Sequence, residues 1–233
     1  MKAFLLAAGI GSRLRPLTDV TPKCMVDIDG RPLLDIWLAA LAAAGIGEVH
    51  VNLHHRPEVV WQYLAGRSEP PLVSTSFEPS LLGSAGTLVA NREWIADEDV
   101  FLACNADNLT DFDVSTLVAA HRSGGAPATV TVFRSDDPGA GGVVELDETA
   151  RVVGFVEKPR NPRSDLVNAG MYAFAPAVVD EIDGEPPRDI GYHLLPRLVG
   201  RARAVQIDGY FRDIGTPAAY RLARSEWSGR VRQ

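Results

Sequence analysis

The sequence is poor in basic residues, in cysteine and in long apolar runs, and each shortage excludes a class of protein. Acidic side chains outnumber basic ones, 30 against 23 in 233 residues, for a formal charge of −7. Neutralising nucleic-acid phosphates needs a basic face, so this balance argues against a nucleic-acid partner. No apolar run reaches the roughly 18 residues that a membrane span needs, and residues 3–10 are too short for a signal peptide. We therefore expect a cytoplasmic protein with neither a nucleic-acid nor a membrane partner.

Cysteine and lysine are both scarce. Cys24 and Cys104 lack the spacing of a metal site, and we expect reduced, buried thiols rather than nucleophiles. Most basic residues are arginines, and only Lys2, Lys23 and Lys158 are lysines. Because two of these lysines fall inside the motifs described below, we infer that those positions need a compact ammonium group rather than a planar guanidinium.

The strongest signal lies in residues 1–30. Residues 2–8 are apolar and end at Gly9-Ile10-Gly11, as expected for a buried strand that leads into a tight loop. The two glycines allow the backbone to approach a ligand closely and to point N–H groups at an anion. Arg13, Arg15 and Lys23 add three cations, and phosphate oxygens bind such charged donors strongly. The pattern predicts a site for the phosphates of a nucleotide.

Other glycine-loop interpretations fit less well. A dinucleotide-binding fingerprint has a third glycine that opens a helix, whereas Leu14 stands there and Pro16 follows. A Walker-type loop needs Gly-Lys-Ser/Thr directly after the turn, and the loop has no such tripeptide. An ordinary turn after a strand accounts for the two glycines, but it leaves the arginines and Pro22-Lys23 unexplained.

These residues form one long motif of fixed spacing, Leu6-Ala7-Ala8-Gly9-x-Gly11-x-Arg13-Leu14-x-Pro16-Leu17-Thr18-x(3)-Pro22-Lys23. The motif resembles the signature of the sugar-1-phosphate nucleotidyltransferases. The resemblance implies an α/β fold of Rossmann-like, doubly wound type, with three layers around a mixed, mostly parallel sheet. It also implies Mg²⁺-dependent transfer of a nucleotidyl group to a sugar 1-phosphate, with release of pyrophosphate. By the same resemblance Arg13 and Lys23 are catalytic, and the nucleotide is held by Leu6, Ala7, Ala8, Gly9 and Gly11.

Periodicity and turn residues predict alternating strands and helices along the rest of the chain. Strands are expected at residues 48–53, 72–76, 100–104, 128–133, 142–146, 152–156, 168–174 and 202–207. Helices are expected at residues 32–44, 57–65, 113–121, 190–199 and 217–227. Asp29-Gly30 predicts a hairpin turn, and His54 and His55 are expected to be solvent-exposed loop residues.

Gly83-Ser84-Ala85-Gly86 stands at the expected start of another helix. It resembles the segment with which many of these enzymes hold the nucleobase, so Gly83, Ser84 and Gly86 are predicted to bind nucleotide. The exposed N–H and C=O groups of such a loop can read the edge of a base. A cap of small residues on the helix is the other interpretation.

Two aspartates are the candidate metal ligands. Asp107 follows the expected strand at 100–104, and ligands of open α/β sheets bind at the carboxyl ends of strands. Mg²⁺ takes one or two carboxylates together with phosphate oxygens and water, so Asp107 is a candidate for both metal and nucleotide binding. The alternative is that Asp107 only caps a turn with Asn108. Residues 209–217 resemble a motif near the end of the family's catalytic domain, and this resemblance adds Asp213 as the second carboxylate.

Phe155-Val156-Glu157-Lys158-Pro159 resembles the sugar-binding signature of the family. A carboxylate can accept hydrogen bonds from two sugar hydroxyls while the neighbouring ammonium meets the sugar phosphate. Taken alone, a Glu-Lys pair is an ordinary surface pair. With the downstream Asn168 the resemblance implies that Glu157, Lys158 and Asn168 bind the sugar, and Gly142 would let the sugar lie against the backbone.

We therefore predict that residues 1–233 form a single catalytic domain, without a β-helix extension, as a monomer or homodimer. The predicted substrates are a nucleoside triphosphate, with GTP favoured, and a heptose- or mannose-type sugar 1-phosphate. Uridylyl, cytidylyl or thymidylyl transfer to another sugar 1-phosphate remains open. So do an inactive regulatory paralogue that binds a nucleotide sugar and, as the least favoured reading, a dinucleotide-dependent oxidoreductase.

Overall fold

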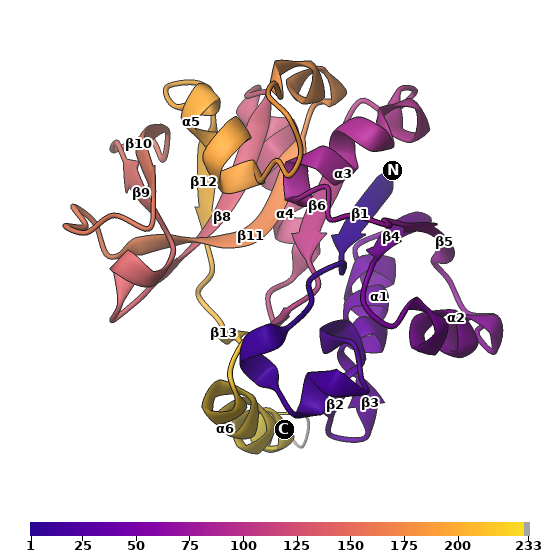
Figure 1. Cartoon of the computed structure of the whole chain (residues 1–233). Coiled ribbons are helices and arrows are strands. Elements are labelled where there is room, and N and C mark those ends of the chain that lie inside the picture. Colours follow the sequence, from indigo (N-terminus) through magenta and orange to yellow (C-terminus); the bar gives the residue numbers. More distant parts are fainter. Residues whose placement is uncertain (231–233) are drawn as a thin grey trace.

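A mixed sheet with helices on both faces organises the chain in a computed structural model that describes residues 1–230 (Figure 1). Seven of its nine strands follow the order β10-β9-β11-β6-β1-β4-β5, and β8 joins β11 and carries β12. The strands of this sheet are β1 (Lys2–Leu6), β4 (Glu48–Leu53), β5 (Leu72–Phe77), β6 (Phe101–Asn105), β8 (Ala128–Arg134), β9 (Gly142–Leu146), β10 (Val152–Glu157), β11 (Leu166–Phe174) and β12 (Arg203–Gln206).

The first strand lies at the centre of the parallel part of the sheet. β1 pairs in parallel with β4 on one side and with β6 on the other, and β5 extends this parallel set beyond β4. β11 then adds to β6 in the antiparallel direction. Ala3, Phe4 and Leu5 are fully buried, because a central parallel strand is covered on both faces. The expected α/β fold with a mixed, mostly parallel sheet is confirmed.

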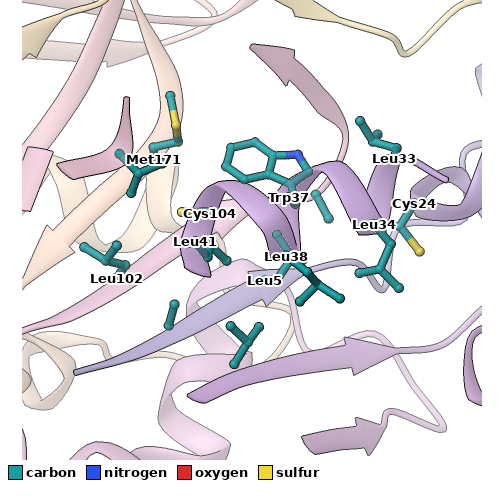
Figure 2. Close-up of a cluster of buried hydrophobic side chains, with 14 of the residues drawn as sticks. Leu5, Cys24, Leu33, Leu34, Trp37, Leu38, Leu41, Leu102, Cys104 and Met171 are labelled. Atoms are coloured by element: carbon teal, nitrogen blue, oxygen red, sulfur yellow. The ribbon is translucent and has the colours of Figure 1, made fainter. Parts of the chain in front are cut away.

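Helices cover both faces of the sheet, and the side chains of each strand alternate between them. Leu5 points into a core built with α1, α2, α4 and α6, whereas its neighbour Phe4 points into a second core built with α3 and α5. Figure 2 shows the first core, in which Trp37 and Leu38 of α1 pack over the strands that carry Leu5 and Cys104. The helices are α1 (Leu33–Ala43), α2 (Pro57–Ala65), α3 (Ser84–Ala90), α4 (Val114–Gly124), α5 (Leu195–Leu198) and α6 (Pro217–Arg230).

Two small antiparallel ribbons lie below the carboxyl ends of β1 and β6. β2 (Asp27–Ile28) and β3 (Arg31–Pro32) form the hairpin predicted at Asp29-Gly30. β7 (Asn108–Thr110) pairs with β13 (Phe211–Asp213), a ribbon that the sequence did not predict. Between β1 and β2 the chain makes three short 3₁₀ turns, η1 (Ser12–Leu14), η2 (Leu17–Asp19) and η3 (Lys23–Met25).

Two local predictions need correction. The helix expected at 190–199 begins as a π-helical turn, η7 (Ile190–Leu194), before α5. Pro196 has no N–H to donate, and the turn before it closes with a wider hydrogen bond from Leu195 to the carbonyl of Ile190. His54 and His55 are half-buried rather than exposed. Nδ1 of His54 bonds the carbonyl of Glu78, and Nε2 of His55 bonds the carbonyl of Thr18, both at 2.7 Å.

The cysteines behave as expected. Cys24 and Cys104 are free and buried, and burial raises the pKa of both thiols to about 12, which keeps them protonated and unreactive at neutral pH. Within residues 1–230, no helix has both the length and the apolar character that crossing a bilayer requires.

Candidate active site

Two adjoining pockets open beyond the carboxyl ends of β1 and β6. The first has a volume of about 470 Å³, and the second, of about 410 Å³, lies on the β9–β11 side of it. Asn105 and Asp107 line both pockets and so mark the place where they meet. Residues predicted to bind nucleotide line the first pocket, and residues predicted to bind sugar line the second.

A cluster of one lysine and two aspartates stands at this junction. The Nζ of Lys23 lies 2.9 Å from Oδ2 of Asp107 and 3.1 Å from Oδ1 of Asp213. The lysine side chain is 9% exposed, whereas the two carboxylates are 45% and 52% exposed and open to the pockets. The two carboxylates therefore converge on the position that the ammonium group of Lys23 occupies.

The β7–β13 ribbon explains how residues so far apart in sequence meet. Asp213 of β13 pairs in register with Asn108 of β7, which immediately follows Asp107. One residue later the N–H of Ile214 donates to the carbonyl of Asp107 at 3.3 Å. Lys23 reaches the same point from η3, at the end of the loop that follows β1.

The two arginines of the first loop have different environments. Arg13 lines the second pocket, with its Nη2 3.9 Å from Oδ2 of Asp213 and 72% of its side chain exposed. Arg15 instead pairs with Asp19 of its own loop at 3.2 Å, and both side chains are mostly exposed. The loop therefore brings Arg13 and Lys23 to the pockets, and the expectation that Arg15 adds a third cation there is not met.

A buried polar network fixes the walls of the first pocket. Oδ1 of Asn52 accepts the N–H of Ala7 at 2.8 Å, and its Nδ2 donates to Glu78 and to Thr87 at 2.8 Å each. The Thr87 hydroxyl donates to Glu78 at 2.6 Å. These groups come from the loop after β1, from β4, from the segment after β5 and from α3. Because the side chains of Asn52, Glu78 and Thr87 are buried and hydrogen-bonded, the network holds the four segments in one arrangement.

Of the residues predicted to bind nucleotide, most line the first pocket: Leu6, Ala7, Ala8, Gly9, Gly83, Ser84 and Asp107. Gly11 and Gly86 line neither pocket. Gly11 lies at the start of η1, where its carbonyl accepts the hydroxyl of Thr18. Gly86 is fully buried in α3.

Three of the four backbone N–H groups in the 83–86 loop, which we expected to be free, have partners within the protein. The N–H groups of Ala85 and Gly86 both donate to the carbonyl of Arg188, at 2.8 and 3.0 Å. The Ser84 N–H donates to Oδ1 of Asp189 at 3.3 Å. The segment before η7 thus packs directly on the start of α3 and takes up the donors that were expected to face a ligand.

Gly83 allows this close packing. Its φ is +78°, and a Cβ there would lie 2.3 Å from the carbonyl oxygen of Arg188. Gly200 is a matched control, because its φ is +79° but nothing lies within 4 Å of its would-be Cβ. An alanine would strain the backbone at either position, and only at position 83 would its side chain also collide with a neighbouring main chain.

We therefore expect Gly83→Ala to lower the free energy of unfolding by about 1–3 kcal/mol more than Gly200→Ala does. Gly83→Ala should also weaken the predicted nucleotide binding, because it displaces the segment whose Pro187 and Asp189 line the first pocket. Urea unfolding and nucleotide titration of the two variants measure both effects. Equal losses in the two proteins would show that the contact with Arg188 contributes nothing.

The residues predicted to bind sugar gather in the second pocket: Gly142, Glu157, Lys158 and Asn168. The Nδ2 of Asn168 donates to the Tyr172 hydroxyl at 2.7 Å, which fixes the orientation of its amide. Gly142 has a further effect, since a Cβ there would lie 2.7 Å from Oε2 of Glu157. Its missing side chain makes room for the carboxylate of Glu157.

The environment of Glu157 has a consequence for stability. Partial burial raises the pKa of its carboxyl, Lys158 opposes the rise, and the charge of Asp189 adds to it. An acid whose pKa is raised by folding stabilises the protein fully only below its unfolded pKa, and that contribution is lost as the pH rises through the folded value. The charged form of Glu157 therefore costs stability at neutral pH.

We expect Glu157→Gln to be more resistant to urea than the parent protein at neutral pH, by a margin that narrows as the pH falls. The same change should raise KM for the sugar 1-phosphate that the sequence predicts as a substrate, since the carboxylate predicted to bind it is lost. Unfolding curves over a pH series check the first effect, with Glu148→Gln at an exposed glutamate as control. A stability difference between Glu157→Gln and the parent protein that grows toward low pH would contradict the raised pKa of Glu157.

Sequence patterns missed several pocket residues. Leu81, Pro187 and Asp189 line the first pocket, and Phe133, Ser135 and Asp137 line the second. Most of them stand in connecting segments without a recognisable motif. Asn52 could have been suspected, because a polar side chain next to the apolar end of a buried strand needs partners.

A doubly wound sheet with a two-part cleft at the carboxyl ends of its central strands defines the nucleotide-diphospho-sugar transferase type of α/β protein. Residues 2–228 match the nucleotidyl transferase family, and the chain belongs to it.

Curated relatives and solved structures agree with this assignment. The chain is 34% identical over 228 residues to mannose-1-phosphate guanylyltransferase 1 of Arabidopsis thaliana, covering 94% of the chain and 63% of the relative. It is 33% identical over 222 residues to the mannose-1-phosphate guanylyltransferase catalytic subunit beta of Dictyostelium discoideum, covering 93% of the chain and 62% of the relative. The chain thus spans less than two thirds of these relatives. The crystal structure of HddC from Yersinia pseudotuberculosis complexed with GMP-PN has the same fold, with a TM-score of 0.81 at 23% identity over 97% of this chain and 99% of that one.

Proposed function

We propose that the protein transfers a guanylyl group from GTP to a mannose- or heptose-type sugar 1-phosphate, releasing pyrophosphate. The observation that carries the proposal is the position of Lys23, Asp107 and Asp213 at the junction of two pockets, one for each substrate. Guanylyl transfer to mannose 1-phosphate is the activity in the names of the Arabidopsis and Dictyostelium relatives, and it supports this choice of substrates.

The reaction is an in-line displacement at the α-phosphorus of the triphosphate. An oxygen of the sugar 1-phosphate forms the new bond, the bond from the α-phosphorus to the bridging oxygen breaks, and pyrophosphate leaves with the electron pair. A phosphate nucleophile is already anionic, so no base has to remove a proton. Catalysis then consists of positioning the reactants and stabilising charge. Lys23 meets the α-phosphate and the sugar phosphate at the junction, and Arg13 holds the leaving phosphates.

The acidic pair fits a divalent cation, as is general in this family, and we assign it to Mg²⁺. Within residues 1–230 no group of three or more His, Cys, Asp or Glu side chains could hold a metal ion. We assign Asp107 and Asp213, which converge on the Lys23 ammonium, as the two protein ligands. Mg²⁺ commonly takes only one or two carboxylates beside phosphate oxygens and water, which supports this assignment. Bound there, the ion would offset the negative charge of the reacting phosphates.

The second pocket holds the sugar. The Glu157 carboxylate accepts hydrogen bonds from sugar hydroxyls, and Lys158 and Asn168 supply donors to the sugar phosphate and hydroxyls. Gly142 keeps the space that the Glu157 carboxylate needs. In the first pocket the backbone from Leu6 to Gly9 supports the nucleotide, together with Gly83 and Ser84.

A pyrophosphate-release assay tests the proposal. The four ribonucleoside triphosphates and deoxythymidine triphosphate are crossed with a panel of sugar 1-phosphates in the presence of Mg²⁺. We expect the largest kcat/KM for GTP with a mannose- or heptose-type substrate. A preference for UTP, CTP or dTTP would reassign the donor. Tight binding of a nucleotide sugar without turnover would identify an inactive regulatory paralogue, a reading that the retained Arg13, Lys23, Asp107 and Asp213 do not favour.

Three further expectations stay predictions from the sequence. They are the monomeric or homodimeric state, the cytoplasmic location, and the single catalytic domain spanning residues 1–233. Size-exclusion chromatography with light scattering measures the first of them directly.

A further inference from the structure

The base-binding end of the first pocket lacks most of the donors that the sequence predicted. The N–H groups of Ala85 and Gly86 are used by the carbonyl of Arg188, and the carbonyl of Leu82 accepts the Arg188 N–H at 2.8 Å. The polar atoms of Asn52 and Glu78 are engaged with each other and with neighbouring groups. Few free hydrogen-bonding groups are therefore left for a nucleobase in this part of the pocket.

Asp189 has a carboxylate oxygen that is free to accept hydrogen bonds from a nucleobase. Its Oδ1 accepts the N–H and the hydroxyl of Ser84, both at 3.3 Å, which orients the carboxylate. In the described part of the chain, its Oδ2 takes part in no hydrogen bond or ion pair. The residue is exposed and lines the first pocket beside Pro187 and Leu81. A flat base can thus lie against apolar surfaces while its edge meets a carboxylate that only accepts hydrogen bonds.

Such an acceptor discriminates among the nucleobases. Guanine presents two neighbouring donors on its Watson–Crick edge, the ring N1–H and the 2-amino group. Uracil and thymine present one N–H between two carbonyl oxygens, which a carboxylate would repel. Cytosine and adenine present an amino group next to an unprotonated ring nitrogen, which also faces a carboxylate unfavourably. Rejection by such unmatched polar groups is stronger than rejection by shape alone.

We propose that Asp189 is the residue that selects guanine, with its Oδ2 accepting from N1–H and from the 2-amino group while Ser84 holds Oδ1. This inference rests on the proposed guanylyl transfer and deepens it, because it excludes the uridylyl, cytidylyl and thymidylyl alternatives. Asp189 acts on specificity; the transfer chemistry remains with Lys23 and the acidic pair.

The test compares guanosine, inosine and xanthosine nucleotides in the parent protein and in Asp189→Asn. Inosine lacks the 2-amino group, and xanthosine carries a carbonyl oxygen in its place. In the variant, Ser84 donates to the amide oxygen and so turns the NH₂ group toward the base, where it repels guanine and matches the xanthine carbonyl. We expect the parent protein to prefer GTP to XTP by at least about 10²-fold in kcat/KM, and Asp189→Asn to lose or invert that preference.

Asp183→Asn is the matched control, because Asp183 stands six residues earlier and pairs with Arg197 at 2.6 Å outside the pockets. It should leave the GTP to XTP ratio unchanged. The parent protein should also turn over ITP about 10-fold less efficiently than GTP, a measurement that does not depend on the folding of any variant. A parent protein that uses ITP as well as GTP would overturn the inference.

Equilibrium binding separates this inference from the proposed reaction. GDP and XDP are titrated into the parent protein and into Asp189→Asn by calorimetry. Suppose that neither protein releases pyrophosphate, but that the affinity for GDP relative to XDP is lower in the variant than in the parent protein. The proposed reaction then fails, and the role of Asp189 stands. Suppose instead that the variant turns over normally, and that neither its kcat/KM for GTP relative to XTP nor its affinity for GDP relative to XDP differs from the parent's. The role of Asp189 is then refuted, and the reaction stands.

Discussion

Replacing Lys23 with alanine should lower kcat/KM at least about 10²-fold, the cost typical of losing one preorganised electrostatic contact to a reacting phosphate. The Lys23 ammonium lies within 3.1 Å of both Asp107 and Asp213, and its side chain is 9% exposed, so solvent cannot take its place easily. Its removal leaves two carboxylates at the junction without the lysine ammonium, at the place where the proposed reaction brings the negative charges of a triphosphate and a sugar phosphate. The loss should appear mainly in kcat, measured by pyrophosphate release at saturating substrates.

Two further lysine variants sharpen this test. Lys2→Ala removes a lysine that pairs with Glu98 at 3.8 Å and donates to the Trp94 carbonyl, away from both pockets, and it should keep parental kinetics. Lys23→Arg keeps the charge but needs room for a planar fork, so it should restore little activity. Near-parental turnover of Lys23→Ala would remove Lys23 from the reaction.

Asp213→Asn should have an effect of similar size, about 10²-fold or more in kcat, with a rise in the Mg²⁺ concentration needed for half-maximal rate. The amide keeps the shape of the carboxylate and loses its charge, so one of the two protein ligands becomes weak. Because the Asp213 side chain is 52% exposed and Asp107 still pairs with Lys23, the free energy of unfolding should change by no more than about 1 kcal/mol. Activity and stability are thereby separated.

Asp208→Asn is the control for this variant, since Asp208 is exposed, lies five residues earlier and lines neither pocket. Steady-state rates over a Mg²⁺ series distinguish the two proteins. An Asp213→Asn protein with parental rates and the parental Mg²⁺ requirement would show that the acidic pair does not hold the ion. The pocket would then need a different metal ligand.

Much of the fold can be predicted from local sequence patterns, because apolar segments that end at glycine or proline define where the strands and helices begin and end. The strand expected at residues 48–53 and the helix expected at 57–65 match β4 and α2 to the residue. The first loop was also predictable in outline, since its glycines and cations have fixed spacing. Periodicity could not show that Arg15 pairs with Asp19, because that pairing depends on how the 3₁₀ turns direct each side chain.

The remaining site features depend on contacts across the sequence. The resemblance predicted that Asp107 and Asp213 act together, but the pairing that brings them together joins two three-residue strands, which are too short to be recognised by alternation. The occupation of the 83–86 backbone donors by Arg188, and the placement of Asp189 in the pocket, depend on a loop that lies about a hundred residues later in the chain. Motif spacing describes a segment by itself and says nothing about which other segment packs on it.

The late position of β13 also affects the order in which the protein becomes competent during synthesis. Translation proceeds from the amino end, and domains acquire structure as they leave the ribosome. The glycine loop of the first pocket is made early, whereas Asp213 follows β12, the last strand of the large sheet, in the sequence. A nascent chain that has not yet exposed Asp213 therefore lacks one acid of the pair, although the first loop and every strand of the large sheet precede that residue.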